Sequence, residues 1–143
     1  MSEVPAAPDW SAFALVASME VDDHGTGFAF SILNTEAALQ TEAVYVWFAS
    51  DGEPLRIGTS KPSVGNRLRQ YPQHINRSLR DGLGPTPPHE AAAWFEIARS
   101  GPLKALAHQP PLITTVCGLI RPYLDIERHL IAQLKPRLNR SHR

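Results

Sequence analysis

Two charged residues stand on helix faces that the surrounding sequence marks as apolar. Glu127 shares one face of the last expected helix with Tyr123, Leu130 and Leu134, so its carboxylate is expected at or near the inward side. Arg67 lies at the edge of the apolar stripe of an earlier expected helix. A carboxylate taken from water without a partner loses several kcal/mol of solvation. Glu127 therefore needs a cation, a metal ion or a set of hydrogen-bond donors beside it.

These two charges admit two interpretations. A structural salt bridge between Glu127 and Arg67 would satisfy both side chains. Alternatively, Glu127 would hold a divalent cation and Arg67 would neutralise a phosphate, which are the two electrostatic tasks of phosphodiester hydrolysis. Residue types and helical spacing alone leave both interpretations open.

The elements that must position these residues begin with an antiparallel hairpin. Residues 43–49 are rich in β-branched and aromatic side chains and end at an Asp-Gly turn signal, and residues 55–59 alternate apolar and polar side chains. This pattern predicts two paired strands. Upstream, apolar pieces at 13–19 and 28–33 flank a turn-forming cluster at 22–27. They predict a strand or a short helix on each side of that turn.

Helices are expected after the hairpin. Ser63 can cap a helix whose apolar stripe is predicted to break at Pro72, with a second helical stretch over residues 73–81. Residues 92–98 are compatible with a strand or with a short helix. The best-defined helix covers residues 122–134, where a broad apolar stripe repeats at helical spacing.

The overall composition is that of one soluble domain. The chain has 143 residues, of which 43% are hydrophobic and 20% charged, and no window approaches the ~20 apolar residues that cross a bilayer. No secretory signal pattern begins the sequence, so we expect a cytoplasmic protein without membrane contact. Cys117 is the single cysteine, which excludes an internal disulfide and a thiolate-rich zinc site. The six histidines show no ligand spacing, and the sequence contains no nucleophile elbow, phosphate loop or dinucleotide fingerprint.

The charges are divided between the two parts of the chain. The formal net charge is zero, yet residues 1–55 carry nine acidic side chains and no Lys or Arg, and all fourteen basic residues lie from Arg56 onward. The second part is therefore expected to hold a polyanion through phosphate contacts. We expect residues 1–42 to form an acidic extension that packs on or flanks a domain of residues 43–143. That extension would either fold away from the basic surface or cover it and hold the protein inactive.

Four short motifs follow one another in the second part of the chain. They are Ala-Val-Tyr at 43–45, Arg-Ile-Gly at 56–58, Asn-Arg-Leu-Arg-Gln-Tyr at 66–71, and Glu-Arg-His-Leu-Ile at 127–131 with Pro-Arg-Leu-Asn at 136–139. In this order they resemble the Gly-Ile-Tyr, Tyr-Ile-Gly, Arg-helix and Glu/Asn blocks of the GIY-YIG nuclease superfamily. No single block is specific, but four in the family's order are.

The resemblance implies an α/β sandwich with a small three-stranded antiparallel sheet flanked by helices, and hydrolysis of DNA assisted by one Mg²⁺ or Mn²⁺ ion. It implies that Glu127 binds the metal, that Arg67 contacts the scissile phosphate, and that Tyr45 positions or deprotonates the attacking water. Asn139 would brace the site. Gly58 is expected where the backbone comes close to its neighbours.

One departure from the family pattern bears on activity. Arg56 replaces the second motif tyrosine, and a guanidinium cannot act as a general base near neutral pH. Tyr71 or Lys61 is a candidate substitute, although a core and a solvated loop position are the simpler interpretations. The expected nucleic-acid contacts are Arg56, Lys61, Arg69, Arg77 and Asn139. Arg56 also leaves open a noncatalytic nucleic-acid-binding or protein-interaction module that retains the fold. Residues 82–119 match no part of the family pattern.

Overall fold

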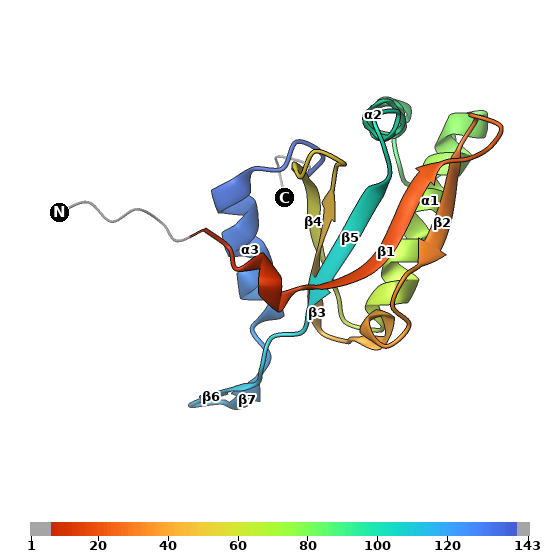
Figure 1. The fold of residues 1–143 in the computed structure, drawn as a ribbon. Helices are drawn as coiled ribbons and strands as arrows, with labels where there is room; N and C mark the ends of the chain where they lie inside the picture. The colour runs from red at the N-terminus through yellow and green to blue at the C-terminus, as the bar shows by residue number, and fades with distance from the viewer. Residues whose placement is uncertain (1–6, 140–143) are drawn as a thin grey trace.

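The computed structural model describes residues 7–139, which form a sheet with helices against both faces (Figure 1). In this part of the chain the main sheet has five antiparallel strands in the order β2-β1-β5-β3-β4. Helices α1 and α2 lie against one face of the sheet and α3 lies against the other. The strands are β1 (Ala14–Val21), β2 (Phe28–Ile32), β3 (Ala43–Phe48), β4 (Pro54–Ser60) and β5 (Leu103–His108).

Three helices and a small hairpin complete the described residues. The helices are α1 (Val64–Asp81), α2 (Pro88–Ala98) and α3 (Tyr123–Leu134), with 3-10 turns η1 (Trp10–Ala12) and η2 (Ala37–Leu39). A separate hairpin of β6 (Ile113–Thr115) and β7 (Gly118–Ile120) projects from the body between β5 and α3 (Figure 1). None of the described helices has the length and apolar content needed to cross a membrane.

Strand β3 lies inside the sheet, between β5 and β4, and distributes its side chains between the two layers. Tyr45 and Trp47 belong to the core that α1 and α2 share with the sheet, and Val44 and Val46 belong to the core under α3. Side chains alternate across a strand, and β3 has a strand on each side and helices over both faces. These neighbours explain its run of buried residues. The predicted hairpin is confirmed, with Tyr45 paired to Gly58.

The expected α/β sandwich is confirmed, and its sheet is larger than the three strands of the family pattern. Strands β4, β3 and β5 are three adjacent strands of this sheet, and β1 and β2 extend it beyond β5. Strand β1 pairs with β2 and with β5, so both apolar pieces around the turn at 22–27 are strands. The N-terminal residues enlarge the sheet because they offer β5 a partner on its free edge. The division of the chain at residue 42 stays a prediction.

The predicted interruption at Pro72 is wrong, because α1 runs through it. Proline removes one helical hydrogen bond and crowds the preceding turn. Here the ring of Pro72 is buried, with Leu68 and Ile75 buried in the same core on either side, and this packing holds the helix together. Ser63 stands at the N-cap as expected, although its side chain makes no capping hydrogen bond. Residues 92–98, left open between strand and helix, are helical.

Candidate active site

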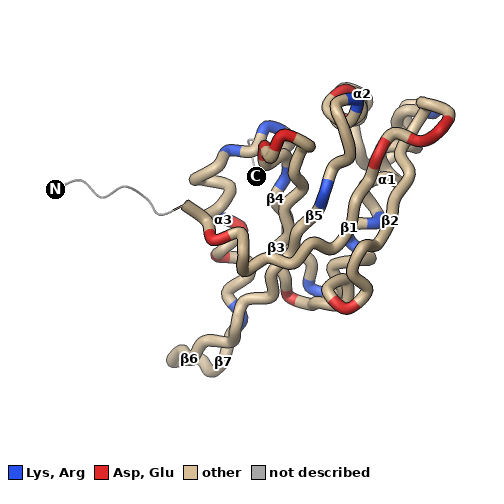
Figure 2. The backbone as a smooth tube through the Cα atoms, viewed as in Figure 1, with Lys and Arg blue, Asp and Glu red and all other residues tan. Residues whose placement is uncertain are grey.

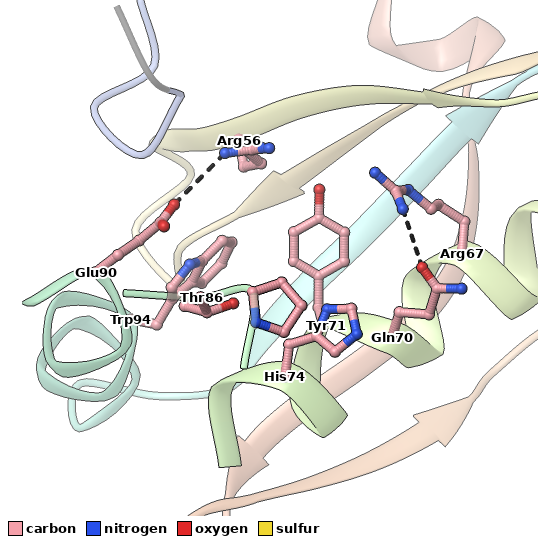
Figure 3. A pocket seen from close by; sticks show the side chains of 9 residues that line it. Arg56, Arg67, Gln70, Tyr71, His74, Thr86, Glu90 and Trp94 are labelled. Carbon is pink, nitrogen blue, oxygen red and sulfur yellow. Dashed lines mark hydrogen bonds and ion pairs between the residues drawn. The ribbon is translucent and has the colours of Figure 1, made fainter. Parts of the chain in front are cut away.

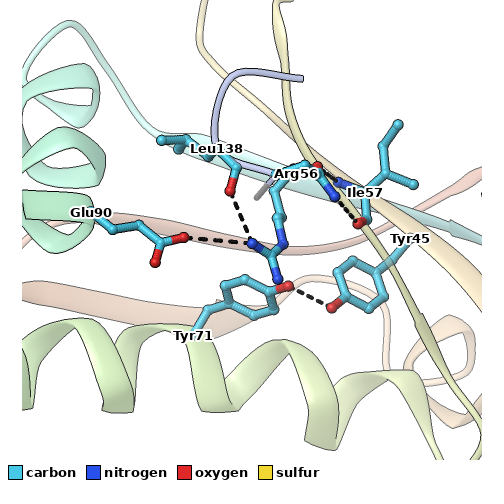
Figure 4. Close-up of polar contacts among 7 residues, drawn as sticks. Tyr45, Arg56, Ile57, Tyr71, Glu90 and Leu138 are labelled. Atoms are coloured by element: carbon cyan, nitrogen blue, oxygen red, sulfur yellow. Dashed lines mark hydrogen bonds and ion pairs between the residues drawn. The ribbon is translucent and has the colours of Figure 1, made fainter. Parts of the chain in front are cut away.

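Two tyrosines from different elements meet under the sheet. Strand β3 carries Tyr45 and helix α1 carries Tyr71, and their hydroxyl oxygens lie 2.5 Å apart (Figure 4). The rings are in edge contact, with centroids 5.8 Å apart. Tyr71 thus brings a second phenol to the first from a helix, whereas the motif position for that phenol holds Arg56. Tyr71, a candidate substitute for the second motif tyrosine, lies beside Tyr45, and its role in a reaction stays a prediction.

Gly58 makes room for the Tyr45 ring. The two residues are opposite each other on β3 and β4. A Cβ atom added at Gly58 would overlap the hydroxyl oxygen of Tyr45. The expected close approach at this glycine is confirmed, and the object that approaches is the Tyr45 side chain.

Tyr45 is neutral under ordinary conditions. Burial raises the pKa of Tyr45 well above its usual value, and the neighbouring Tyr71 raises it further, whereas the Arg67 guanidinium acts in the opposite direction. Only 1% of Tyr45 is exposed. A protonated, buried phenol can orient a partner through hydrogen bonds but is not a ready base.

Tyr71, but not Tyr45, lines a cleft of about 250 Å³ (Figure 3). Arg67, Tyr71 and His74 line it from one face of α1, because residues three and four apart in a helix are neighbours. Arg56 lines it from β4 and Trp94 from α2. The cleft therefore combines two guanidinium groups with a phenol and an imidazole, a set suited to a phosphate-bearing ligand.

Arg56 is held inside the protein by two oxygen atoms. Its Nη1 donates a hydrogen bond to the Leu138 carbonyl at 2.9 Å and lies 3.5 Å from Oε1 of Glu90 (Figure 4). Only 14% of the Arg56 side chain and 10% of the Glu90 side chain are exposed. Glu90 lies on α2, within the segment that matched no family block. Pro88 at the start of α2 was the available signal, since proline favours the first turn of a helix.

Asn139 braces the outer edge of the hairpin. Its Oδ1 accepts a hydrogen bond from the Ile57 N–H at 2.8 Å, and its Nδ2 donates to the Ile57 carbonyl at 2.9 Å. The Leu138 N–H also donates to the Leu55 carbonyl at 3.0 Å. Strand β4 is an edge strand with unpaired backbone groups on that side. The residues after α3 satisfy part of this edge and hold β4 beside the cleft.

Glu127 is half-buried on α3, and its side chain makes no hydrogen bond or ion pair with any residue in the described range 7–139. Burial raises the pKa of Glu127, while the charges of Arg56, Arg128 and Arg67 lower it. Glu127 and Arg67 therefore interact electrostatically at a distance, but no ion pair within 4 Å joins them among the described residues. The interpretation of this pair as a structural salt bridge is wrong. The carboxylate oxygens are available to another ligand.

The donor set fits a hard divalent cation held by few protein ligands. No group of three or more His, Cys, Asp or Glu side chains that could hold a metal occurs within residues 7–139. Mg²⁺ usually keeps several waters and is bound by one or two carboxylates together with substrate phosphate oxygens. Glu127, half-buried and without a side-chain partner among residues 7–139, suits that role.

The remaining basic residues expected to contact nucleic acid lie at different places around α1. Lys61 is exposed in the turn before the helix. The guanidinium carbon of Arg69 lies 5.7 Å from the centroid of the Phe30 ring, on the side that faces β2. Burial lowers the pKa of His74, and the charges of Arg67 and Arg77 lower it further. Neither Arg69 nor Arg77 is among the residues that line the cleft. Their contacts with nucleic acid stay predictions.

The acidic first part of the chain does not cover this cleft within the described residues. No residue before Arg56 lines it. Asp22 and Asp23 lie in the turn between β1 and β2, at the end of the sheet far from α3 (Figure 2). Glu90 is the acidic residue that lines the cleft, and it faces Arg56. The alternative that residues 7–42 fold away from the basic cleft is the one observed.

Comparison with known proteins supports the fold. No protein-family model matches the chain, and no curated protein matches it in sequence. Among solved structures, the chain resembles a point mutant of EndoII of bacteriophage T4, with a TM-score of 0.61 and 20% identity over 90% of this chain and 92% of that one. Restriction endonuclease HPY188I in complex with product DNA is more distant, with a TM-score of 0.47 and 12% identity over 88% and 78% of the two chains. The mixed α/β architecture of this chain is therefore similar to that of the T4 EndoII nuclease.

Proposed function

We propose that this protein is a metal-dependent endonuclease of the GIY-YIG type that hydrolyses DNA phosphodiester bonds. The observation that carries the proposal is convergence: the Arg67 guanidinium on α1 acts electrostatically on Tyr45 from β3 and on Glu127 from α3, although the three residues are far apart in sequence. The fold shared with the T4 nuclease EndoII supports it.

Each residue has a chemical task in this reaction. Arg67 has an exposed position in the cleft and would bind the scissile phosphate and stabilise the charge that develops on its oxygens. The tyrosine hydroxyls would orient the attacking water. Glu127 would bind Mg²⁺ or Mn²⁺, and the bound cation would supply Lewis acidity at the phosphate. Water oxygen bonds to phosphorus as the bond to the leaving oxygen breaks. The proton of the water passes to solvent, and the leaving oxygen takes up a proton from solvent.

Arg56 departs from the family pattern without placing a free cation in the middle of the site. The Leu138 carbonyl and Glu90 hold its guanidinium, so its charge is partly neutralised by groups of the protein itself. The hydroxyl absent at this position is supplied by Tyr71. The partly neutralised charge of Arg56 and the hydroxyl of Tyr71 together support a nuclease in which the second motif tyrosine has been replaced.

A noncatalytic nucleic-acid-binding module is the second candidate. The observation that favours it is the protonated, buried state of Tyr45, which is unsuited to proton abstraction. Such a module would use Arg67 and the other cations of α1 to bind phosphates and would hydrolyse nothing.

Cleavage assays with two variants of α3 separate these candidates. Supercoiled plasmid and labelled single-stranded, duplex and branched DNA are incubated with Mg²⁺ or Mn²⁺. The wild type should nick or cut at least one substrate and stop when a chelator is added. Glu127→Gln should lose cutting and keep binding. Asp125→Asn is the matched control, because that carboxylate lies on the same helix, is 73% exposed and pairs with Arg128. It should cut like the wild type.

The opposite result would identify the second candidate. A wild-type protein that binds DNA in a salt-sensitive manner but cuts none of these substrates with either metal would be a noncatalytic module. Equal loss of cutting in Asp125→Asn and Glu127→Gln would contradict the assignment of Glu127 as the metal ligand.

A further inference from the structure

We infer that Tyr71 is the catalytic tyrosine whose hydroxyl contacts the attacking water, and that Tyr45 is a positioning residue behind it. This inference rests on the proposed nuclease function and assigns the catalytic role to the tyrosine of the Arg-helix block rather than to Tyr45. The sequence resemblance alone assigns that role to Tyr45.

Access to the cleft distinguishes the two phenols. Tyr71 lines the cleft, and Tyr45 does not. Tyr45 is 1% exposed, lies on β3 between two neighbouring strands, and has its ring against Gly58. Since the two hydroxyl oxygens are 2.5 Å apart, a water molecule that enters the cleft and reaches this pair meets the Tyr71 oxygen first (Figures 3 and 4).

Hydrogen-bond valence supports the same order. A phenol has one donor hydrogen and an oxygen that accepts, and a guanidinium only donates. Either hydroxyl of the tyrosine pair can donate to the other. We assign Tyr45 as the donor, because Tyr71 lines the cleft and Tyr45 does not. Tyr71 then retains its O–H and a lone pair for ligands in the cleft.

The helix also places phosphate and water on adjacent turns. Arg67 and Tyr71 are four residues apart on one face of α1, which corresponds to about 6 Å along the helix axis. Both line the cleft. A phosphate held by Arg67 therefore lies beside the Tyr71 hydroxyl, at a separation suited to a water molecule between them.

The proton can leave without either tyrosine being ionised beforehand. As the water oxygen bonds to phosphorus and the bond to the leaving oxygen breaks, the water proton moves to the Tyr71 oxygen. The hydroxyl hydrogen of Tyr71 passes to solvent in the cleft at the same time. Burial of Tyr45, which raises its pKa, keeps that residue neutral and in its donating role.

Three single Tyr→Phe variants test this assignment, because the chain has three tyrosines. The rate of single-turnover cleavage of a labelled duplex is measured with Mn²⁺, and the Kd for the same duplex is measured in chelator. Tyr71→Phe should reduce the rate by about 100-fold or more and change the Kd by less than about twofold. Its residual rate should rise about tenfold per pH unit, since hydroxide then replaces the assisted water. Tyr45→Phe should reduce the rate by only about tenfold, because Tyr71 stays in the cleft but loses its orienting partner. Tyr123→Phe, on α3, is the matched control and should be unchanged.

A second measurement uses the unmodified protein. Nitration with tetranitromethane followed by peptide mapping should modify Tyr71 before Tyr45, whose hydroxyl is shielded. Nitration of Tyr45 first would overturn the inference, and so would a 100-fold loss in Tyr45→Phe with near-normal cleavage by Tyr71→Phe. Both results leave the nuclease function intact. A wild type that cuts no substrate would overturn the proposed function and this inference with it.

Discussion

Replacement of Arg56 by Met should destabilise the protein by about 3 kcal/mol and leave the salt dependence of DNA binding almost unchanged. The expectation follows from the position of the guanidinium, which donates to the Leu138 carbonyl at 2.9 Å and pairs with Glu90 at 3.5 Å. If Arg56 were instead a phosphate contact, the same substitution would weaken DNA binding and change stability little.

The magnitude combines two losses and one compensation. A hydrogen bond from a charged donor contributes about 1.5–3 kcal/mol. Removing one partner of a buried ion pair typically costs about 3–5 kcal/mol, and here the Arg56 and Glu90 side chains are 14% and 10% exposed. Met retains the packing of the aliphatic stem, which offsets part of these losses. A net value of about 3 kcal/mol follows.

Urea unfolding of a double-mutant cycle measures this value. Arg56→Met, Glu90→Gln and the double variant should show a coupling of about 1–3 kcal/mol. Arg80→Met is the matched control, because that side chain is 71% exposed and its removal should change stability by less than about 0.5 kcal/mol. The reasoning is refuted if Arg56→Met changes stability by under about 1 kcal/mol while the salt slope of log K falls by about one.

Three further substitutions test the packing and charge of the site. Gly58→Ala should destabilise by about 1–3 kcal/mol in urea unfolding and slow DNA cleavage, because its Cβ displaces Tyr45; unchanged cleavage would contradict this. Asn139→Ala should lower stability by about 1–2 kcal/mol and speed hydrogen exchange at the Ile57 amide, because that N–H donates to Asn139 Oδ1. Unaltered exchange would show that Asn139 does not hold β4 in place. Glu127→Gln should be more stable than the wild type at pH 7 and equal to it at pH 4, in thermal unfolding. Burial raises the folded-state pKa of Glu127. The stability that its protonated carboxyl contributes to the protein is therefore fully present below the unfolded-state pKa and is lost as pH rises through the folded-state pKa. A wild type that is more stable than Glu127→Gln at pH 7 would contradict this prediction.

Local pattern was sufficient for the elements whose side chains repeat at a fixed period. The strand at 43–48, its hairpin partner and the last helix were predicted within a few residues of their observed bounds, because alternation and helical spacing record which face is buried. The interruption predicted at Pro72 was wrong because local pattern was insufficient there. The prediction considered only the hydrogen bond that proline removes. The burial of Pro72, beside Leu68 and Ile75, depends on a core to which strands earlier in the chain contribute.

The sequence by itself determined which chemistries the chain can support. Tyr45, Gly58, Arg67, Glu127 and Asn139 occur in an order that resembles a nuclease pattern, and every Lys and Arg lies in the second part of the chain. These properties depend on residue type and order, which the sequence states directly.

Only the tertiary structure decided which of these groups meet. It brought the Tyr71 hydroxyl to Tyr45, set Glu90 against Arg56, and left Glu127 without a protein partner among the described residues. The first two contacts join residues 26 and 34 positions apart in the chain. Contacts of this kind are set by how strands and helices pack around a shared core, because packing selects one arrangement of side chains from many that the local sequence permits.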